Sequence, residues 1–340
     1  MGKLLGEPDI FRALRKKTVL MTEPQTLQLA DFEDAAVRLE GIIHRTPLVP
    51  FRSFENDSTI LLKLEIHQPI TSFKIRGVFH AVSRLSADER KAGISTVSAG
   101  NTAQAVAWAG RFFGVPAQSV MPETAPASKI EAVRRLGGTP VLKPMEEVFR
   151  YLKEHLWEKE PYSFIHPWTN RNVRIGHGSM GLEILHDRPD AETVFIPVGG
   201  GGLMGGVGAA LKLLKPEIKI VAVEPEGCPS FHTSLRQGKP ATVDCNTICD
   251  GVAVPYMTEE MFPVLKELAD DTVLVSERMV KSYVKRLALH DKIVVEPSAA
   301  LAVAAADNYS ENEKGIRVAL VTGGSIDAEK FTGILNDPDL

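Results

Sequence analysis

Short runs of β-branched and other apolar residues alternate along this chain with longer stretches rich in Ala and Leu. The short runs predict strands and the longer stretches predict helices, because their lengths and periodicities are typical of those elements. Strands that alternate with helices pair in parallel through right-handed crossovers, and helices then cover both faces of the sheet. The sequence therefore predicts an α/β fold. Strands are expected at 59–65, 94–98, 117–121, 139–142, 162–165, 193–198, 218–224 and 316–322. Helices are expected at 29–40, 73–85, 101–113, 128–137, 145–158, 171–186, 203–214, 258–269, 276–290, 297–308 and 327–335.

The chain has 340 residues, of which 44% are hydrophobic and 24% charged, and its formal net charge is -4. This length can bury a large core in one two-lobed unit or in two small domains. The nearly balanced charge gives no reason to expect nucleic acid or an anionic membrane as a partner. No apolar run reaches the roughly 18 residues that span a bilayer. The basic first twenty residues lack the apolar core of a signal peptide, so we expect a cytoplasmic protein.

The three cysteines are Cys228, Cys245 and Cys249. An odd and sparse set is not typical of a secreted disulfide framework. The pair Cys245 and Cys249 also lacks a second pair of zinc ligands nearby. We therefore expect reduced thiols, as in most cytosolic proteins.

A glycine-rich segment, G-G-G-G-L-M-G-G-V-G at 199–208, follows the expected strand 193–198 and opens a helix. Free backbone N–H groups and the helix dipole make such a turn an anion site. Gly200, Gly202 and Gly205 also satisfy the dinucleotide pattern G-x-G-x-x-G, and Glu224 ends the next strand where an acid could bind a ribose. Three interpretations stay open from this segment alone: a phosphate of a mononucleotide type, an NAD site and a structural turn.

A lysine stands at the start of the helix expected at 73–85. Lys74 is flanked by Phe73, Ile75 and Gly77, whereas a solvated helix start would be more polar. Apolar neighbours and a helix N-terminus disfavour the ammonium form and lower the pKa. Lys74 is therefore either an amine nucleophile or an ordinary surface residue.

Two further strand-to-helix turns carry small polar residues. Residues 98–104 read S-A-G-N-T-A-Q, and residues 321–325 read V-T-G-G-S. Asn, Ser and Thr serve as helix N-caps, and spacing alone favours that role. The alternative is a second anion site, in which Ser98, Asn101 and Thr102 hold a carboxylate.

Taken together, these motifs resemble those of the fold-type II pyridoxal-phosphate (PLP) enzymes, in the branch of serine/threonine dehydratases and serine racemases. The motifs S-F-K-I-R-G, S-A-G-N-T-A-Q, P-V-G-G-G-G-L, V-E-P-E-G, V-E-P-S-A-A and T-G-G-S occur in that family's order. The likeness runs from about residue 30 to 335. Ordered co-occurrence is far more specific than one glycine pattern, so it favours PLP over NAD.

The resemblance implies a role for each matching residue. Lys74 is expected to hold the PLP aldehyde covalently and then to remove the Cα proton, while Phe73 packs beside the ring and Asn101 binds its phenolic oxygen. Thr322 is expected to face the pyridine nitrogen, and Glu296 to approach the cofactor. The phosphate is expected at the backbone N–H groups of Gly199, Gly200, Gly201, Gly202 and Leu203. The substrate is expected at Ser72, Ser98, Ala99, Gly100, Asn101 and Thr102.

The resemblance also implies an architecture and an activity. The fold is expected to have two lobes, like the tryptophan synthase β-subunit: a large PLP-binding domain of residues 25–82 and 166–340, and a small mobile domain of residues 83–165, after a flexible extension at 1–24. The activity is expected to convert L-threonine, L-serine or a related β-hydroxy amino acid to a 2-oxo acid and ammonia. Alternatives are a 3-substituted serine such as 3-hydroxyaspartate or phenylserine, or another type II lyase or β-replacement reaction. A homodimer or higher homo-oligomer is expected.

Several positions depart from the family pattern. Ala99 stands where the racemases carry a proton-exchanging serine, so we expect poor racemisation. Thr71 replaces a usual glycine. His177 stands in for a glutamine and is expected to be a satisfied structural hydrogen bonder, while Arg171 and Arg174 are expected to be solvated. Glu224 matches a cation ligand of some relatives, but Ser230 stands where those relatives have an aspartate, so we expect no metal.

Overall fold

The larger of two sheets in the computed structural model has 6 strands, in the order β1-β2-β10-β7-β8-β9. The model describes residues 27–52, 59–309 and 315–340. The strand β1 pairs antiparallel with β2, and all other neighbours in this sheet are parallel. Parallel pairing and burial on both faces confirm the predicted fold class. The strands are β1 (Leu48–Pro50), β2 (Ile60–Leu64), β7 (Ala191–Pro197), β8 (Lys219–Pro225), β9 (Asp271–Val275) and β10 (Ile316–Val321).

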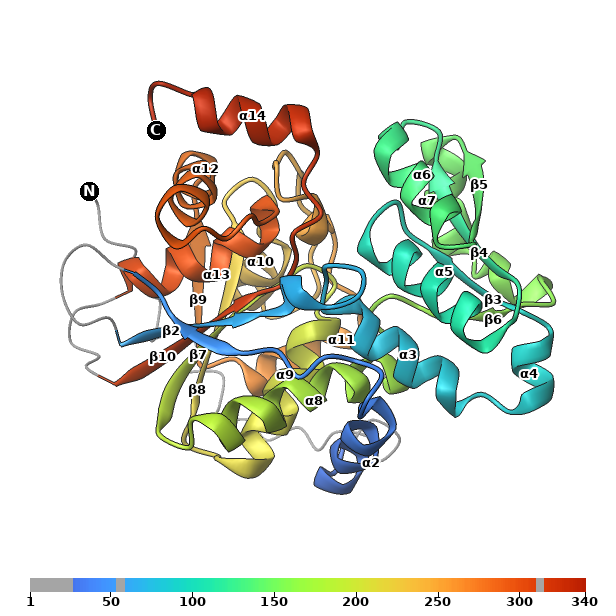
Figure 1. Ribbon diagram of the computed structural model, residues 1–340, viewed down its shortest axis with the longest axis horizontal. Coiled ribbons are helices and arrows are strands. Elements are labelled where there is room, and N and C mark those ends of the chain that lie inside the picture. Colours follow the sequence, from blue (N-terminus) through green and yellow to red (C-terminus); the bar gives the residue numbers. More distant parts are fainter. Residues whose placement is uncertain (1–26, 53–58, 310–314) are drawn as a thin grey trace.

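The smaller sheet has 4 strands in the order β5-β4-β3-β6, all parallel. They are β3 (Ile94–Val97), β4 (Ala117–Pro122), β5 (Thr139–Lys143) and β6 (Ser163–Phe164). All of its strands come from residues 94–164, so one continuous stretch of chain builds this sheet. Figure 1 shows it to the right of the larger sheet.

Helices cover both sheets. They are α2 (Leu29–Leu39), α3 (Lys74–Arg84), α4 (Ala87–Lys91), α5 (Asn101–Phe113), α6 (Ala127–Arg135), α7 (Met145–Lys153), α8 (Arg171–Asp187), α9 (Gly202–Leu214), α10 (Ser230–Gln237), α11 (Met261–Leu268), α12 (Glu277–Arg286), α13 (Pro297–Asn308) and α14 (Ala328–Asn336). None of the helices in the described ranges is long and apolar enough to cross a membrane.

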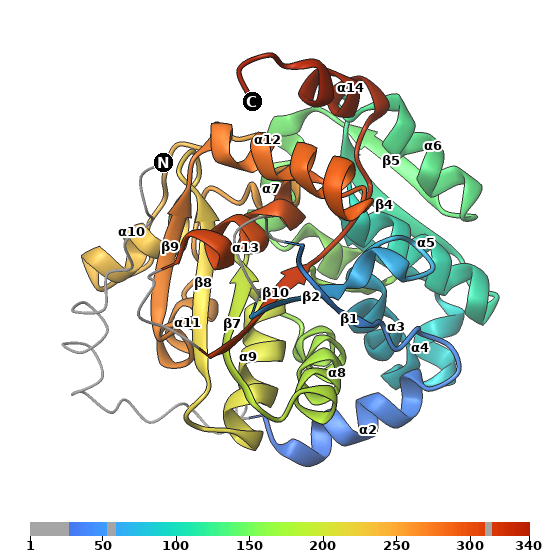
Figure 2. The ribbon, with the colours of Figure 1, turned by 60° about the vertical axis from the view of Figure 1, so that its left-hand side comes forward.

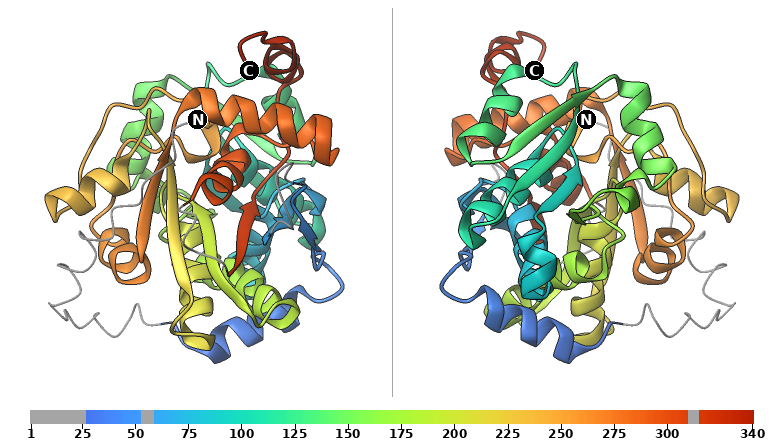
Figure 3. Two further views of the ribbon diagram at one scale, coloured as in Figure 1. Left: turned by 90° about the vertical axis from the view of Figure 1, so that its left-hand side faces the viewer. Right: turned by 90° about the vertical axis from the view of Figure 1, so that its right-hand side faces the viewer.

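The core of the larger sheet follows the period of a strand. Phe195 of β7 faces a cluster with the alanine-rich α13, while its neighbours Val194 and Ile196 face a second cluster with α9. Successive side chains of a strand point to opposite faces, so a continuous apolar run fills both layers. Figures 2 and 3 show α13 on one side of the strands and α8 and α9 on the other.

The predicted elements are present, with shifts at their ends. The helix expected at 145–158 stops at Lys153, because His155 takes a positive φ of 52° before a 3-10 turn at Leu156–Lys159. The helix expected at 276–290 ends as a π-helix at Leu287–Asp291. The sequence analysis missed β1, β9, α4 and α10, which are all short. The expected extension at 1–24 lies outside the described residues.

The prediction of three reduced thiols is wrong for two of them. Cys228 and Cys245 form a disulfide, with their Cα atoms 4.4 Å apart, while Cys249 is a free and buried cysteine. The reason is a tertiary contact: the backbone N–H of Asn246 donates to the carbonyl oxygen of Gly227 at 2.8 Å. The chain around Cys245 therefore runs beside the turn that carries Cys228. Spacing in the sequence does not reveal this contact.

Candidate active site

A cavity of about 300 Å³ lies between the two sheets, where several parallel strands end. Ser98 follows β3, Gly199 follows β7 and Thr322 follows β10, and all three line this cavity. The carboxyl ends of parallel strands are the usual place for ligands in open α/β sheets. The predicted residues that line it are Phe73, Lys74, Ser98, Ala99, Gly100, Asn101, Thr102, Gly199, Gly200, Gly201, Gly202, Leu203, Glu296 and Thr322. Ser72 lies just behind them, fully buried.

Lys74 is the first residue of α3 and its amine reaches into the cavity. The Nζ atom lies 4.7 Å from the centroid of the Phe73 ring. Burial lowers the pKa of Lys74 to about 8, although the carboxylate of Glu296 opposes this shift. An amine with that pKa is partly neutral near physiological pH, and only the neutral form attacks a carbonyl. The surroundings of Lys74 therefore favour the role of an amine nucleophile over that of an ordinary surface residue.

Backbone contacts fix the start of α3 against the last strand. The N–H of Phe73 donates to the carbonyl oxygen of Thr322 at 3.1 Å, and Ser72 forms an isolated bridge with Gly323. Thr71 takes a left-handed φ of 54°, which explains why glycine is usual at this position. Its hydroxyl lies 3.0 Å from that of Ser325. The T-G-G-S turn thus fixes the three residues that precede Lys74.

The glycine turn (Gly199–Leu203) is packed so closely from behind that side chains do not fit. A Cβ atom built on Gly200 would lie 2.3 Å from the Trp168 ring, and one on Gly199 would lie 2.9 Å from the Cα of Val252. Gly201 takes a positive φ of 89°. The turn leads into α9, whose first N–H groups have no carbonyl partner within their own helix. Those N–H groups and the helix dipole make a site for a phosphate.

Asn101 and Glu296 meet across the cavity. The amide Nδ2 of Asn101 donates to both carboxylate oxygens of Glu296 at 3.0 Å. Burial raises the pKa of Glu296 to about 7, which the hydrogen bond from Asn101 opposes. This contact joins α5, beside the smaller sheet, to the start of α13, beside the larger one. Neither residue type nor spacing predicts it, because the two positions are far apart in sequence.

Several lining residues were not expected from the sequence. They are Lys129 from α6, Leu152 from α7, Pro167 and Trp168, and the segment Asp250–Tyr256. The segment belongs to a long connection after α10, and no local pattern marks it. Trp168 could have been noticed as a large aromatic residue beside a proline, but nothing in the sequence places it under the glycine turn.

Two expectations about the 166–179 segment are wrong. Arg174 is only 3% exposed, not solvated, because α8 packs against α9. His177 is fully buried, and neither ring nitrogen has a hydrogen-bond partner among the described residues. Its ring centroid lies 4.8 Å from that of Phe73. Arg171 pairs with Asp31 at 2.8 Å, and its side chain is 41% exposed.

Glu224 is bound to backbone groups at the start of α10. Its carboxylate accepts from the N–H groups of Phe231 at 2.8 Å and His232 at 2.7 Å, and burial raises its pKa to about 7. Across the described ranges, no group of three His, Cys, Asp or Glu side chains could hold a metal ion. The two backbone hydrogen bonds of Glu224 fix the start of α10, a contact that the sequence analysis missed.

The residues around the cavity fit PLP. The glycine turn offers free N–H groups to a phosphate, and its packed rear surface accepts no Cβ. Lys74 offers an amine of lowered pKa to an aldehyde, and the Phe73 ring offers an apolar surface to a planar ring. Thr322, 3% exposed at the cavity wall, offers an uncharged hydroxyl.

Comparison with known proteins agrees with this fit. A family model described as pyridoxal-phosphate dependent enzyme matches residues 39–323. The chain is 39% identical over 317 residues to an L-threonine ammonia-lyase of Thermotoga maritima, which covers 91% of this chain and 78% of the relative. It is 33% identical to the processed form of threonine deaminase isoform 2 from Solanum lycopersicum, with a TM-score of 0.84, covering 95% and 99% of the two chains. It is 32% identical to maize serine racemase, with a TM-score of 0.83, covering 90% and 95%. The resemblance noted in the sequence is thus confirmed: the chain belongs to the fold-type II pyridoxal-phosphate-dependent enzymes, in the family of threonine dehydratases and serine racemases.

Proposed function

We propose that this protein is a PLP-dependent ammonia-lyase that converts L-threonine or L-serine to a 2-oxo acid and ammonia. The observation that carries the proposal is the half-buried amine of Lys74, with a pKa of about 8, in one cavity with the glycine turn and the 98–102 loop. The names of the relatives support threonine as the substrate. The bound PLP supplies an electron-accepting ring that stabilises negative charge at the substrate Cα.

The chain's own residues bind, orient and move protons. The N–H groups of the glycine turn bind the phosphate, while Phe73, Asn101 and Thr322 hold the ring. Lys74 would hold the aldehyde, and its neutral Nζ would remove the Cα proton of the substrate. The uncharged Thr322 does not force a proton onto the ring nitrogen as a carboxylate would, which favours prompt loss of the β-hydroxyl.

The substrate carboxylate is assigned to the start of α5. The N–H groups at Gly100 and Asn101 are near a helix N-terminus, where an anion is stabilised. The hydroxyl of Ser98 accepts from the N–H of Gly100 at 3.1 Å, which shapes this loop. Ser72 and Thr102 are buried beside it. Ala99 has no exchangeable proton, so it supports elimination over racemisation.

The division into domains follows from the same assignment. We place a large PLP-binding domain at 25–82 and 166–340 and a small mobile domain at 83–165, which carries the asparagine loop. Closing the small domain on the substrate would exclude water from the reacting Cα. We also propose a cytoplasmic homo-oligomer, dimeric or larger.

The test is to replace the lysine. Lys74→Ala is expected to lose both the covalent link to PLP and the release of 2-oxo acid from L-threonine. The link is measured by mass spectrometry after borohydride reduction, and the 2-oxo acid by a coupled dehydrogenase assay. The matched control is Lys91→Ala, because Lys91 is an exposed lysine on α4 and should change neither readout.

Three outcomes would overturn the proposal. PLP attached to another residue, or to none, would remove the assignment of Lys74. Covalent PLP without 2-oxo acid from L-threonine or L-serine would favour a 3-substituted serine or β-replacement chemistry, which the same assay detects with phenylserine, 3-hydroxyaspartate or an added thiol. Rapid formation of D-serine would favour a racemase.

A further inference from the structure

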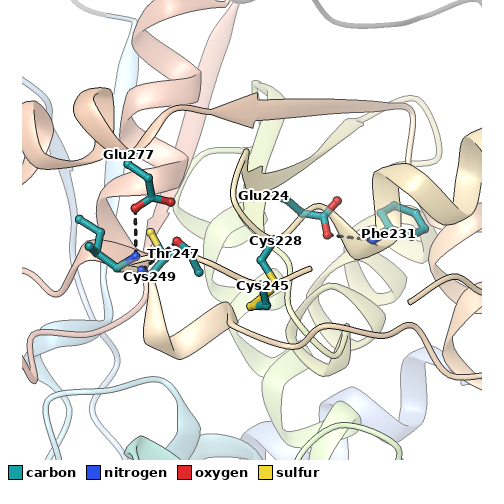
Figure 4. Close-up of a disulfide and its surroundings, with 8 residues drawn as sticks. Glu224, Cys228, Phe231, Cys245, Thr247, Cys249 and Glu277 are labelled. Carbon is teal, nitrogen blue, oxygen red and sulfur yellow. Dashed lines mark hydrogen bonds between the residues drawn. A yellow bond between two sulfur atoms is a disulfide. The ribbon is translucent and has the colours of Figure 1, made fainter. Parts of the chain in front are cut away.

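The Cys228–Cys245 disulfide joins the turn after β8 to a segment that leads to the wall of the active site. Cys228 lies in the turn between β8 and α10, near Glu224, and Cys245 lies in the connection after α10. Figure 4 shows the disulfide between the contact of Glu224 with Phe231 on one side and Thr247, Cys249 and Glu277 on the other. The disulfide therefore attaches a loop to the carboxyl edge of the larger sheet.

The attached segment, which we name the tethered loop (residues 241–257), has a closed base. The N–H of Val243 donates to the carbonyl oxygen of Pro255 at 2.8 Å, and the N–H of Met257 donates to that of Ala241 at 3.0 Å. Thr242 and Tyr256 form an antiparallel bridge between them. Because its two ends are paired, a shift of the chain at Cys245 is transmitted to residues 255–257.

The far side of the tethered loop is a wall of the active site. Residues 250–256 line the cavity. Val252 lies directly behind Gly199, since a Cβ on that glycine would approach its Cα to 2.9 Å. Tyr256 lies edge-on to Trp168 at 6.4 Å between ring centroids, and Trp168 supports Gly200. The position of the tethered loop thus sets the rear support of the glycine turn.

The tethered loop is held more weakly at 244–247 than at 248–252, where Cys249 and Val252 belong to the core of the larger sheet and Asp250 pairs with Lys129. Asn246 donates its N–H to Gly227, Ile248 donates to the Glu277 carboxylate at 2.9 Å, and Gly251 donates to the Ser298 hydroxyl at 2.9 Å. Between the closed base and Ile248, the anchors given by the described residues are the disulfide and the single hydrogen bond to Gly227.

One end of the disulfide is open to a reagent. Cys245 is exposed, whereas Cys228 is 1% exposed. A thiolate can therefore approach the sulfur of Cys245, and the sulfur of Cys228 then leaves as a thiolate and takes up a proton. The second thiol of a dithiol displaces Cys245 from the mixed disulfide. In total the protein gains two electrons and two protons, and the dithiol is oxidised to its own disulfide.

We propose that the Cys228–Cys245 disulfide is a reducible tether, and that its reduction by a dithiol loosens the tethered loop and weakens the binding of PLP and substrate. The inference rests on the proposed function, because it takes the cavity to be the PLP site. A loop that spends part of its time away from the glycine turn lowers the fraction of binding-competent protein, and the apparent Kd rises as the inverse of that fraction.

The experiment compares oxidised and reduced forms of the full chain. The protein is reduced with dithiothreitol, which is then removed without air so that it does not react with PLP. Amide hydrogen exchange is measured across 241–257 in the apo form, and PLP affinity by absorbance. We expect faster exchange at Val243, Asn246 and Met257 on reduction, and an increase of the PLP Kd of about fivefold. The variant carrying both Cys228→Ser and Cys245→Ser should show the hydrogen exchange and the PLP Kd of reduced protein, and dithiothreitol should change neither.

The control is Cys249→Ser, which keeps the disulfide and should respond to reduction like the wild type. Three free thiols in protein purified without reductant would overturn the inference. Unchanged amide hydrogen exchange and an unchanged PLP Kd after reduction would also overturn it. This comparison uses only the wild type, so it does not depend on the folding of a variant. Failure of the proposed function looks different: oxidised wild type would then carry no PLP on Lys74, while the exchange measurement would still report on the tether.

Discussion

The amine of Lys74 differs from that of a surface lysine because of where it lies. Its burial in the cavity wall lowers its pKa from the ordinary 10.5 to about 8, and the charge of Glu296 keeps it from falling further. Such opposing influences are typical of catalytic lysines, since burial alone would leave a group that never carries a proton.

The first prediction concerns the pH dependence of cofactor capture. Only the neutral amine attacks an aldehyde, so the rate at which apo protein captures PLP should rise about tenfold per pH unit below pH 8 and level off above it. An ordinary lysine would level off near its pKa of about 10.4. Stopped-flow absorbance of PLP binding measures this rate.

Glu296→Gln provides the matched comparison. Because the Glu296 carboxylate raises the pKa of Lys74, its removal should move the midpoint to lower pH. A midpoint that stays in place, or moves to higher pH, would show that the two groups do not interact as their positions suggest.

At the scale of elements, the glycine turn depends on the surface behind it. Trp168 fills the space that a side chain at Gly200 would need, and Leu265 does so at Gly201, where a Cβ would lie 2.6 Å from its Cδ1. The turn can present its N–H groups to a phosphate only while it stays against these residues. Its shape is therefore set by a loop and a helix far away in sequence.

The second prediction follows from this packing. Gly200→Ala places a Cβ 2.3 Å from a ring carbon of Trp168, so the turn must move and the PLP Kd should rise at least about tenfold. The control is Gly333→Ala on the exposed face of α14, where a Cβ meets nothing within 4 Å. It should leave the Kd unchanged and stabilise the protein by up to about 1 kcal/mol. Equal PLP affinity of Gly200→Ala and wild type, by equilibrium dialysis, would contradict this account.

How far the sequence predicts this structure depends on the range of each interaction. Local periodicity places the long elements, such as α5 and α13, nearly to the residue. It fails for β9 and α10. Both are short, and strand pairing or capping by distant segments stabilises them more than their own sequence pattern does. The motifs around Lys74, Asn101 and the glycine turn predict the cavity wall that they form. Local patterns cannot reveal the disulfide, the contact of Asn101 with Glu296, or the wall at 250–256, because each joins distant segments.

At the scale of the molecule, a small number of polar contacts join the two halves. Lys129 of α6 pairs with Asp250, and Ser128 donates to Asp327 at 3.2 Å. Together with the bond from Asn101 to Glu296 and the apolar packing of α3 on α5, they hold the smaller sheet against the larger one. Exposed ion pairs contribute little each, so we expect the Lys129–Asp250 pair to break and form again if the smaller half moves as proposed.

The third prediction tests the ion pair. Lys129→Met should raise the KM for the amino-acid substrate by up to about fivefold, which corresponds to a surface pair of at most about 1 kcal/mol. It should change kcat less. Raising the salt concentration should increase the KM of wild type but not that of the variant, because salt screens the pair.

Lys143→Met is the matched control, since Lys143 pairs with Glu147 at 3.2 Å within the smaller half alone. A Lys129 variant that behaved like the Lys143 variant in steady-state kinetics would show that the contact with Asp250 does not help the halves to close.

The smaller sheet is built from one uninterrupted stretch, residues 94–164, and the chain enters it through α3 and leaves it toward α8, two helices that pack against each other. It is therefore an insertion with adjoining ends, carried by a scaffold that holds Lys74 and the glycine turn. We therefore expect an exchange of this insertion between relatives to keep the lysine and the phosphate site on the scaffold, provided that the contacts of α5 with α3 and Glu296 are kept. The segment that faces the substrate and the segment that holds the cofactor are thus separate stretches of chain, and each can be replaced by itself in a chimeric protein.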